Sequence, residues 1–478
     1  MTESRTITLP TGIAAPPPDL SRPHFIGIGG VGTSGLARVL VTRGARVTGS
    51  DASSARLDEL AAAGCAVRPG HDAPPPADAS CVVVSTAIGD DNPEVIAARA
   101  AGIRVVHRAQ VLAALMDGHT GLAVAGTHGK SSTTAMLATV FTRLGANPSY
   151  AIGATLAETG ANARHGDGPL FIAEADESDL SFLWLRQALA VILNVEHDHP
   201  ENYSGLDAHL DAYARFADGI VPGGTLVISA DDTGAAELTG RLRASRRDLK
   251  IVTYGAAPGA DWHITELTAS GMSSQVIVTT PGGQQVTASL PVPGRHMAHN
   301  AVAALAAAVQ AGATADAAAL ALGSYRGIRG RLTQRGGTPG GALVLDSFAH
   351  HPTAISADLE AARTLAGDSG QVIAVFQPCG YTRTIAQAPE MAVALKAADM
   401  AVLLEIHASV GEPVPGVSAR LIADAGTGQL ASPSDAVKRV TAAAGPGDVV
   451  LVMGTGGDLG LLAEWICAAL AASQPALR

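Results

Sequence analysis

Short apolar runs alternate with amphipathic stretches along most of this chain, which is typical of strands and helices in an α/β protein. In the first part of the chain the pattern predicts strands at 24–28, 46–49 and 81–84 and helices at 31–43, 56–63 and 93–101. Strands that alternate with helices pair in parallel through right-handed crossovers. This first unit should therefore contain a parallel sheet and end near Gly118.

A second unit begins with a predicted strand at 121–125, followed by a glycine turn and a helix that ends near Leu144. The further elements expected here are strands at 170–173 and 190–194, hairpin strands at 262–268, 274–279 and 284–290, and an alanine-rich helix at 299–310. The hairpins are indicated by the change to short alternating runs around a Pro-Gly-Gly turn.

A glycine-rich break at 336–341 indicates a linker to a third unit. In that unit the apolar runs predict strands at 342–345, 372–376, 401–404 and 449–452, with helices between them. No repeat is visible at a period of about 20–50 residues. The expected architecture is therefore three α/β units in series.

Length and charge limit the function classes. A chain of 478 residues exceeds one ordinary core. The net charge of −11 and the aromatic content of 3% argue against nucleic-acid partners and an anionic membrane surface. Residues 1–22 are polar and proline-rich and lack the apolar core of a signal peptide. With four isolated cysteines and no apolar run suited to a bilayer, we expect a cytoplasmic protein.

The first glycine motif, Gly27-Ile-Gly29-Gly30-Val-Gly32, follows a predicted strand and opens a predicted helix. Such a turn lets backbone N–H groups approach a diphosphate at the helix N-terminus. Asp51 follows about 20 residues later, where a ribose hydroxyl is read in dinucleotide-binding proteins. The motif favours a nucleotide diphosphate site. It leaves open which nucleotide binds, and the dinucleotide cofactor of a dehydrogenase is one candidate. The alternative is a turn that needs glycine only for packing.

The second glycine motif is a phosphate loop that consists of Gly126, Thr127, His128, Gly129, Lys130, Ser131 and Ser132. It follows an apolar strand, and Val124 stands where the usual phosphate-loop pattern has its first glycine. Lys130 would reach the β- and γ-phosphates and the Ser131 hydroxyl would bind Mg²⁺. No other lysine precedes Lys250, so a chance lysine in this loop is improbable.

Acidic and polar clusters follow two of the predicted strands. One includes Glu174 and Asp176, and the other runs from Asn194 to His199. Beside a phosphate loop, such clusters favour Mg²⁺ or Mn²⁺ over zinc because oxygen ligands predominate. Each cluster alone could be a solvated loop.

Three further segments carry polar candidates. Asn300 could read an adenine edge or could equally cap its helix. The segments 346–352 and 376–383 follow predicted strands, and their histidines and arginine would suit carboxylate and phosphate groups. For His350-His351-Pro352, the alternative is a capped helix start.

In this order the motifs 126–130, 174–179, 194–199, 293–300 and 350–352 resemble those of the Mur ligases of peptidoglycan synthesis. The resemblance runs from His24 to about Gly460 and replaces the dehydrogenase interpretation. It implies a Rossmann-like UDP-binding domain, a phosphate-loop ATP-binding domain with a parallel sheet plus a small antiparallel sheet, and a Rossmann-like C-terminal domain. The boundaries we expect are 1–22 for a flexible segment, then 23–118, 119–336 and 337–478.

The resemblance also implies a reaction. ATP would phosphorylate the lactyl carboxylate of UDP-N-acetylmuramate, and the amine of L-alanine, or of another small amine, would attack the acyl phosphate. The expected cofactors are ATP and two Mg²⁺ ions. Relatives that add later residues use a carbamylated lysine, and the absence of lysine between Lys130 and Lys250 fits the alanine-adding branch. Either a monomer or a homodimer is compatible with the sequence.

Residue roles follow from the same resemblance. Lys130, Glu174, His199, His350 and Arg383 would be catalytic, with Ser131 and Glu174 on one Mg²⁺ and His199 on the second. At the nucleotide, His296 and Asn300 would lie by the adenine, and Arg331 and Asp346 by the triphosphate and ribose. The UDP site would comprise Gly29, Gly30, Ser50, Asp51, His71, Ser85, Thr86, Ala87 and Ile88.

Several positions depart from the family pattern. The usual His-Arg pair before the tyrosine is Cys379-Gly380, the usual tyrosine before Ala-His-His is Phe348, and Asp-Val-Tyr is replaced by Glu405-Ile-His407. The Asp-His segment continues with Pro200-Glu201. These changes gather on the amine side, as in a paralogue with another amine or acid substrate, used in peptide recycling or specialised metabolism. Lineage drift and a nucleotide-binding regulator without turnover are the alternatives.

Overall fold

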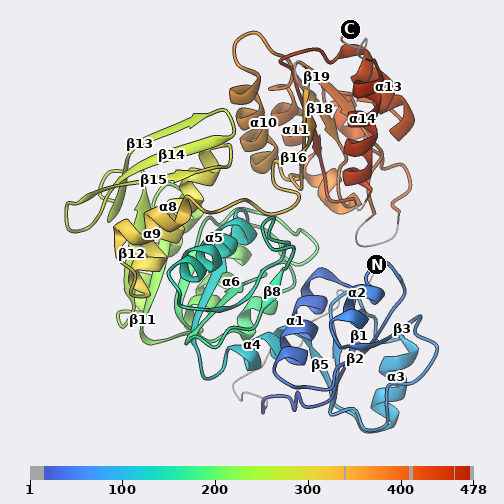
Figure 1. Cartoon of the computed structure of the whole chain (residues 1–478), viewed down its shortest axis with the longest axis vertical. Coiled ribbons are helices and arrows are strands. Elements are labelled where there is room, and N and C mark those ends of the chain that lie inside the picture. Colours follow the sequence, from blue (N-terminus) through green and yellow to red (C-terminus); the bar gives the residue numbers. More distant parts are fainter. Residues whose placement is uncertain (1–15, 338–340, 409–412, 457, 474–478) are drawn as a thin grey trace.

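The computed structural model describes residues 16–337, 341–408, 413–456 and 458–473. Residues 1–15 of the predicted flexible segment lie outside these ranges. Three sheets organise the chain, each in its own part of the molecule (Figure 1). Within the described ranges, no helix is both long enough and apolar enough to span a membrane.

The first sheet has five parallel strands in the order β3-β2-β1-β4-β5. Its elements are β1 (Pro23–Ile26), α1 (Val31–Thr42), β2 (Thr48–Asp51), α2 (Leu57–Ala62), β3 (Ala66–Pro69), β4 (Cys81–Val84), α3 (Pro93–Ala100), β5 (Val105–His107) and α4 (Arg108–Met116). The predicted parallel sheet is confirmed. Hydropathy did not indicate β3, an edge strand without a buried residue, or β5, which has three residues.

The central sheet has ten strands in the order β15-β14-β13-β12-β11-β10-β6-β9-β7-β8. Its strands are β6 (Thr120–Ala125), β7 (Ser149–Ala151), β8 (Ala163–Arg164), β9 (Leu170–Glu174), β10 (Gln187–Ile192), β11 (Ile220–Ser229), β12 (Lys250–Gly255), β13 (Trp262–Ser270), β14 (Ser273–Thr279) and β15 (Gln285–Leu290). Because β13 pairs in parallel with β12 and antiparallel with β14, the predicted hairpins continue the parallel sheet.

The helices of the central unit are α5 (Lys130–Arg143), η1 (Ser181–Trp184), α6 (Leu206–Asp218), α7 (Thr233–Ser245), α8 (Arg295–Gln310) and α9 (Ala315–Leu322). Helix α8 begins earlier than predicted, after Gly294 with φ +104°. Asn300 therefore lies within the helix, and the helix-cap alternative for it is wrong. Alanines along α8 are fully buried, which lets this helix pack closely against α5 and the sheet.

The third sheet has the order β16-β17-β21-β18-β19-β20, and all its pairs are parallel except β16 with β17. Its elements are β16 (Thr333–Gly337), β17 (Leu343–Ser347), α10 (Pro352–Ala366), β18 (Val372–Phe376), α11 (Tyr381–Leu395), β19 (Met400–Leu403), α12 (Arg420–Asp424), β20 (Gln429–Leu430), α13 (Pro433–Ala443), β21 (Val449–Met453) and α14 (Leu459–Ser473). The predicted linker at 336–341 is wrong at its start, because Gly336 and Gly337 pair within this sheet. Residues 338–340 of it lie outside the described residues. The three-unit α/β fold is confirmed.

Candidate active site

The phosphate loop joins β6 to α5 through two glycines in conformations that side chains rarely adopt. Gly126 has φ +143° and Gly129 has φ +84°, so the chain turns sharply before Lys130 starts the helix. A Cβ on Gly129 would lie 2.6 Å from Asn300 Oδ1. Asn300 of α8 therefore lies against the loop itself, at the N-terminus of α5, where backbone N–H groups bind anions.

Lys130 is held inside the loop by three acceptors. Its ammonium donates to the carbonyls of Gly126 (2.8 Å) and Thr127 (3.3 Å) and to Glu177 Oε1 (2.8 Å). Burial alone would lower the pKa of Lys130, but the carboxylates of Glu177 and Asp176 outweigh burial and raise it. Glu177 is 1% exposed, and burial raises its pKa. The cation is thus charged and already positioned beside the loop.

Ser131 and Glu174 lie together beside the phosphate loop, at the end of β9. The Ser131 hydroxyl donates to Glu174 Oε1 (2.9 Å), and the Gly153 N–H donates to Glu174 Oε2 (2.6 Å). A Cβ on Gly153 would lie 2.6 Å from the same carboxylate. A hydroxyl and a carboxylate this close offer the hard oxygen ligands that Mg²⁺ prefers.

The residues that follow β10 hold the phosphate loop through hydrogen bonds. Asn194 accepts from the His128 N–H (2.7 Å) and donates to the His128 carbonyl (3.2 Å). The Thr127 hydroxyl bonds both the carbonyl and the N–H of Glu196. The predicted cluster at 194–199 therefore partly acts as the scaffold of the phosphate loop.

His199 has φ +51° and its Nδ1 lies 3.1 Å from Glu201 Oε1. Burial alone would lower its pKa, but Glu201, Asp198 and Glu177 outweigh burial and raise it. Asp198 in turn accepts from the Nε (2.9 Å) and Nη2 (2.8 Å) of Arg383, which is 8% exposed. This buried ion pair joins the central unit to α11 of the third unit.

A cleft of about 700 Å³ lies between the first two sheets. The predicted residues that line it are Gly29, Gly30, Asp51, His71, Ser85, Thr86, Ala87 and Ile88. Glu174, Gly153 and Asp176 of the central unit line the same cleft. The glycine turn of the first unit and the carboxylate beside the phosphate loop thus open into one space.

Two of the predicted residues, Asp51 and Ser50, form hydrogen bonds that hold cleft residues in place. The Asp51 carboxylate accepts a hydrogen bond from the Gly29 N–H (2.8 Å) and so fixes the backbone of the glycine turn. Ser50 is fully buried and bonds His71 Nδ1 (3.0 Å), which also lies 3.1 Å from Glu94 Oε1. Burial alone would raise the pKa of Glu94, but its hydrogen bonds, led by the one from His24, outweigh burial and lower it.

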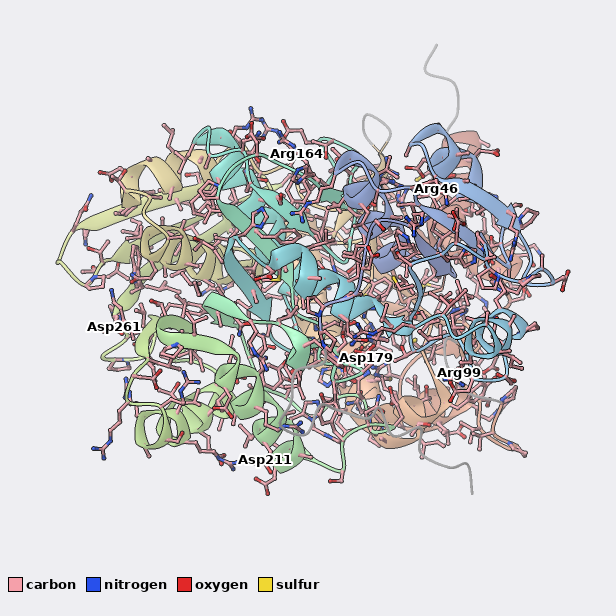
Figure 2. All side chains as sticks on the ribbon, turned by 90° about the horizontal axis from the view of Figure 1, so that it is seen from below. Arg46, Arg99, Arg164, Asp179, Asp211 and Asp261 are labelled. Carbon is pink, nitrogen blue, oxygen red and sulfur yellow. The ribbon has the colours of Figure 1, made fainter. Side chains whose placement is uncertain are left out.

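Sequence reasoning missed Arg108, the first residue of α4. Its guanidinium donates to Asp176 Oδ2 (2.8 Å) and lies 3.7 Å from Asp179 Oδ2. Asp179 is labelled in Figure 2, where the first and central units meet. Arg108 also lines the cleft next to Gly32, so one side chain contacts both halves of the site. The sequence carried no signal for it, because Arg108 follows β5, a strand that hydropathy did not indicate.

The third unit places His350, Arg331 and Phe348 together. Burial and the neighbouring Arg383 lower the pKa of His350 to about 3. The Arg331 guanidinium lies 5.0 Å from the centroid of the Phe348 ring, a cation–π contact. Burial lowers the pKa of Arg331.

Asp346 and His296 each have an ionic partner. Asp346 accepts from Arg335 Nε (2.8 Å) and Nη2 (2.7 Å), while its Oδ1 is buried with no hydrogen bond. His296 Nε2 lies 3.6 Å from Asp358 Oδ1 across the boundary between the central and third units. Burial lowers the pKa of His296 and raises that of Asp358.

His351 caps α10, since its Nδ1 accepts from the Thr353 N–H (3.3 Å) and Pro352 follows at the first helical position. The helix-start alternative for 350–352 is therefore confirmed. His351 Nδ1 also lies 3.1 Å from His128 Nε2 of the phosphate loop. Burial and His128 lower the pKa of His351 to about 4.

Family models match most of the chain. The Mur ligase family catalytic domain matches residues 22–120, the Mur ligase middle domain 124–308, and the Mur ligase glutamate ligase domain 330–456. The UDP-N-acetylmuramate–L-alanine ligase of Streptomyces griseus is 49% identical over 454 residues, 93% of this chain and 97% of that protein. The same-named ligase of Thermobifida fusca is 44% identical over 449 residues, 91% of this chain and 94% of that protein.

Solved structures agree with these matches. The crystal structure of UDP-N-acetylmuramate–alanine ligase from Thermotoga maritima superposes with a TM-score of 0.78 at 26% identity, covering 95% of this chain and all of that one. A murein peptide ligase from Psychrobacter arcticus gives a TM-score of 0.69 at 24% identity, covering 96% of this chain and all of that one, which shows the shared fold.

Proposed function

The chain belongs to the Mur ligase family. From that membership we propose that it joins L-alanine to the lactyl carboxylate of UDP-N-acetylmuramate, with cleavage of ATP to ADP and phosphate. The observation that carries this proposal is the shared cleft. Gly29 and Ser85 of the first unit and Glu174 beside the phosphate loop line one space. A UDP-sugar whose diphosphate lies on the glycine turn would present its carboxylate to the phosphate loop.

On this proposal, Lys130 and the loop N–H groups neutralise the triphosphate, because a carboxylate and a phosphate otherwise repel. Ser131 and Glu174 fit Mg²⁺ by their hard oxygen atoms and their 2.9 Å separation. The ion would supply additional charge neutralisation at the phosphates. Lys130 can move to a phosphate from the Gly126 and Thr127 carbonyls that it now binds.

His199, His350 and Arg383 would serve the second half-reaction. His199 lies next to Asp198, which the Arg383 guanidinium binds. His350 has a pKa of about 3, so it is neutral at pH 7 and can accept a hydrogen bond at the ring nitrogen not occupied by the Phe348 carbonyl. A neutral imidazole and a guanidinium would together bind an incoming amine and a phosphate leaving group.

The second candidate is a Mur-type ligase with a different amine substrate. It is favoured by the positions of the residues that differ from the family pattern. Cys379 and His407 occupy facing positions on neighbouring segments, and the Gly380 N–H donates to the His407 carbonyl (2.9 Å). Cys379 is 3% exposed. Two departures from the family pattern thus meet just before α11, with Cys379 four residues before Arg383, and would change the amine pocket together.

Phosphate release with ATP, Mg²⁺ and UDP-N-acetylmuramate, measured across a panel of amino acids and short peptides, tests both candidates. Release that depends on L-alanine supports the proposal. Release with another amine but not with L-alanine supports the second candidate. If no amine stimulates release although ATP binds, both fail.

A further inference from the structure

Two histidines and a glutamate meet where the phosphate loop faces the third unit. His128 Nε2 and His351 Nδ1 are 3.1 Å apart. Glu196 Oε2 lies 3.8 Å from the first and 3.9 Å from the second. All three ligand atoms fall within 4.8 Å of one another. The side chains of these three residues have no role in the ligase reaction proposed above, in which the backbones of His128 and Glu196 support the phosphate loop.

These separations match those of ligands around one metal ion. Nitrogen and oxygen atoms about 2.0–2.1 Å from a tetrahedral ion lie roughly 3.3–3.4 Å apart. The observed separations of 3.1, 3.8 and 3.9 Å bracket that value, so small side-chain shifts would complete the geometry. Two imidazoles with one carboxylate favour Zn²⁺ and its neighbours in the first transition row over Mg²⁺.

The surrounding hydrogen bonds orient each of two ligands toward the common point. The His351 Nε2–H donates to the His197 carbonyl (3.4 Å), so the Nδ1 atom carries the lone pair. That lone pair now accepts from the Thr353 N–H (3.3 Å), and it would exchange this weak cap bond for the bound ion. The Thr353 hydroxyl donates to Glu196 Oε2 (2.6 Å) and fixes that carboxylate. Carbonyl and hydroxyl partners of this kind support metal-binding histidines and carboxylates in proteins.

We propose that His128, Glu196 and His351 form a site for a transition-metal ion of the Zn²⁺ class that bridges the phosphate loop and the N-terminus of α10. His128 and Glu196 belong to the central unit and His351 to the third. A bound ion therefore ties the two units together at the ATP side of the molecule. This site is separate from Ser131 and Glu174, whose oxygen atoms suit Mg²⁺.

The test is a Co²⁺ titration of the full chain in excess Mg²⁺, followed by displacement with Zn²⁺. Tetrahedral Co²⁺ reports on the site through its visible absorption. The variants are H128N and E196Q in the central unit and H351N in the third, where asparagine retains the helix cap. T353A removes the hydroxyl that orients Glu196. H119N is the control, because His119 directly precedes β6 and the phosphate loop follows the opposite end of that strand.

We expect one tetrahedral Co²⁺ per chain in the wild type and in H119N. Loss of a ligand in H128N, E196Q or H351N should weaken binding by more than about 100-fold, and T353A by about 10–100-fold. Thermal unfolding without metal verifies that each variant folds, and if one variant does not fold the other two decide. Equal affinity in the wild type and the folded variants would overturn the site and leave a plain His128–His351 hydrogen bond. Loss confined to the central-unit variants would overturn the bridge.

Discussion

Lys130 and Glu177 form a buried pair, so substituting the lysine has two separable effects. K130A removes the cation that would neutralise the triphosphate, and we expect phosphate release to fall by at least about 100-fold. It also leaves Glu177, 1% exposed, without its partner, which costs about 3–5 kcal/mol of stability.

The double variant K130A/E177Q separates these effects. The neutral amide in E177Q leaves no buried charge that the Lys130 ammonium would have to pair with. Thermal stability should therefore recover while activity stays lost. Phosphate-release assays and thermal unfolding of both variants provide the measurement. Activity that returns along with stability would contradict the phosphate role of Lys130.

His351 makes the protein sensitive to acid. Its folded-state pKa of about 4 is below the ordinary value of 6.5, so the unfolded chain binds the proton first as pH falls. This contribution to stability is complete above pH 6.5 and is lost as pH falls toward 4. For a side chain that is 6% exposed, the expected loss from pH 7 to 5 is about 2 kcal/mol. Melting curves at both pH values should show a smaller decrease in H351N, and an equal decrease would contradict this assignment.

At the scale of elements, the apolar runs that became central strands were readable because both faces are buried. Strands β4, β18 and β21 illustrate this, with at most one partly exposed residue among them. Strand β11 was missed because its Pro222-Gly-Gly triplet indicates a turn, although the strand continues through it. Strand β11 is stabilised by pairing with β10 and β12, and the sequence around the triplet does not reveal these partners.

Helix α5 offers a matched pair of glycines at its two ends. G129A places a Cβ 2.6 Å from Asn300 Oδ1 at φ +84°, so it should distort the phosphate loop and weaken ATP binding at least about tenfold. G145A has φ +76° but open space around the new atom, so it should cost only about 1–2 kcal/mol of stability and leave ATP binding unchanged. Calorimetric titration with ATP compares the two. Similar ATP affinity in both variants would refute the close contact at Gly129.

At the scale of the whole molecule, contacts between units carry the site, and these were invisible in the sequence. Arg108 meets Asp176 across 68 positions and Arg383 meets Asp198 across 185. The loop motifs were recognisable because their glycines and Lys130 are adjacent in sequence. Their partners come from other strands of the central sheet, as Asn194 does, or from another unit, as His351 does, and only the folded arrangement brings them together.

Arg108 should couple the two halves of the cleft. R108M breaks the ion pair with Asp176 and should raise the KM for UDP-N-acetylmuramate about tenfold or more, with a smaller effect on the KM for ATP. R99A removes an exposed ion pair with Asp90, which is worth at most about 1 kcal/mol, and should leave both KM values unchanged. Steady-state kinetics of the two variants tests this, and a normal KM for the UDP-sugar in R108M would count against the coupling.

The most direct test of the ligase reaction follows oxygen atoms. UDP-N-acetylmuramate labelled with ¹⁸O in the lactyl carboxylate is incubated with ATP, Mg²⁺ and L-alanine, and the released phosphate is analysed by mass spectrometry. In the proposed reaction the carboxylate attacks the γ-phosphate, and the amine of alanine then attacks the acyl carbon and displaces phosphate. Each released phosphate therefore carries one labelled oxygen, and the amide retains the other. Unlabelled phosphate, or labelled phosphate whose release does not require L-alanine, would contradict the proposed reaction.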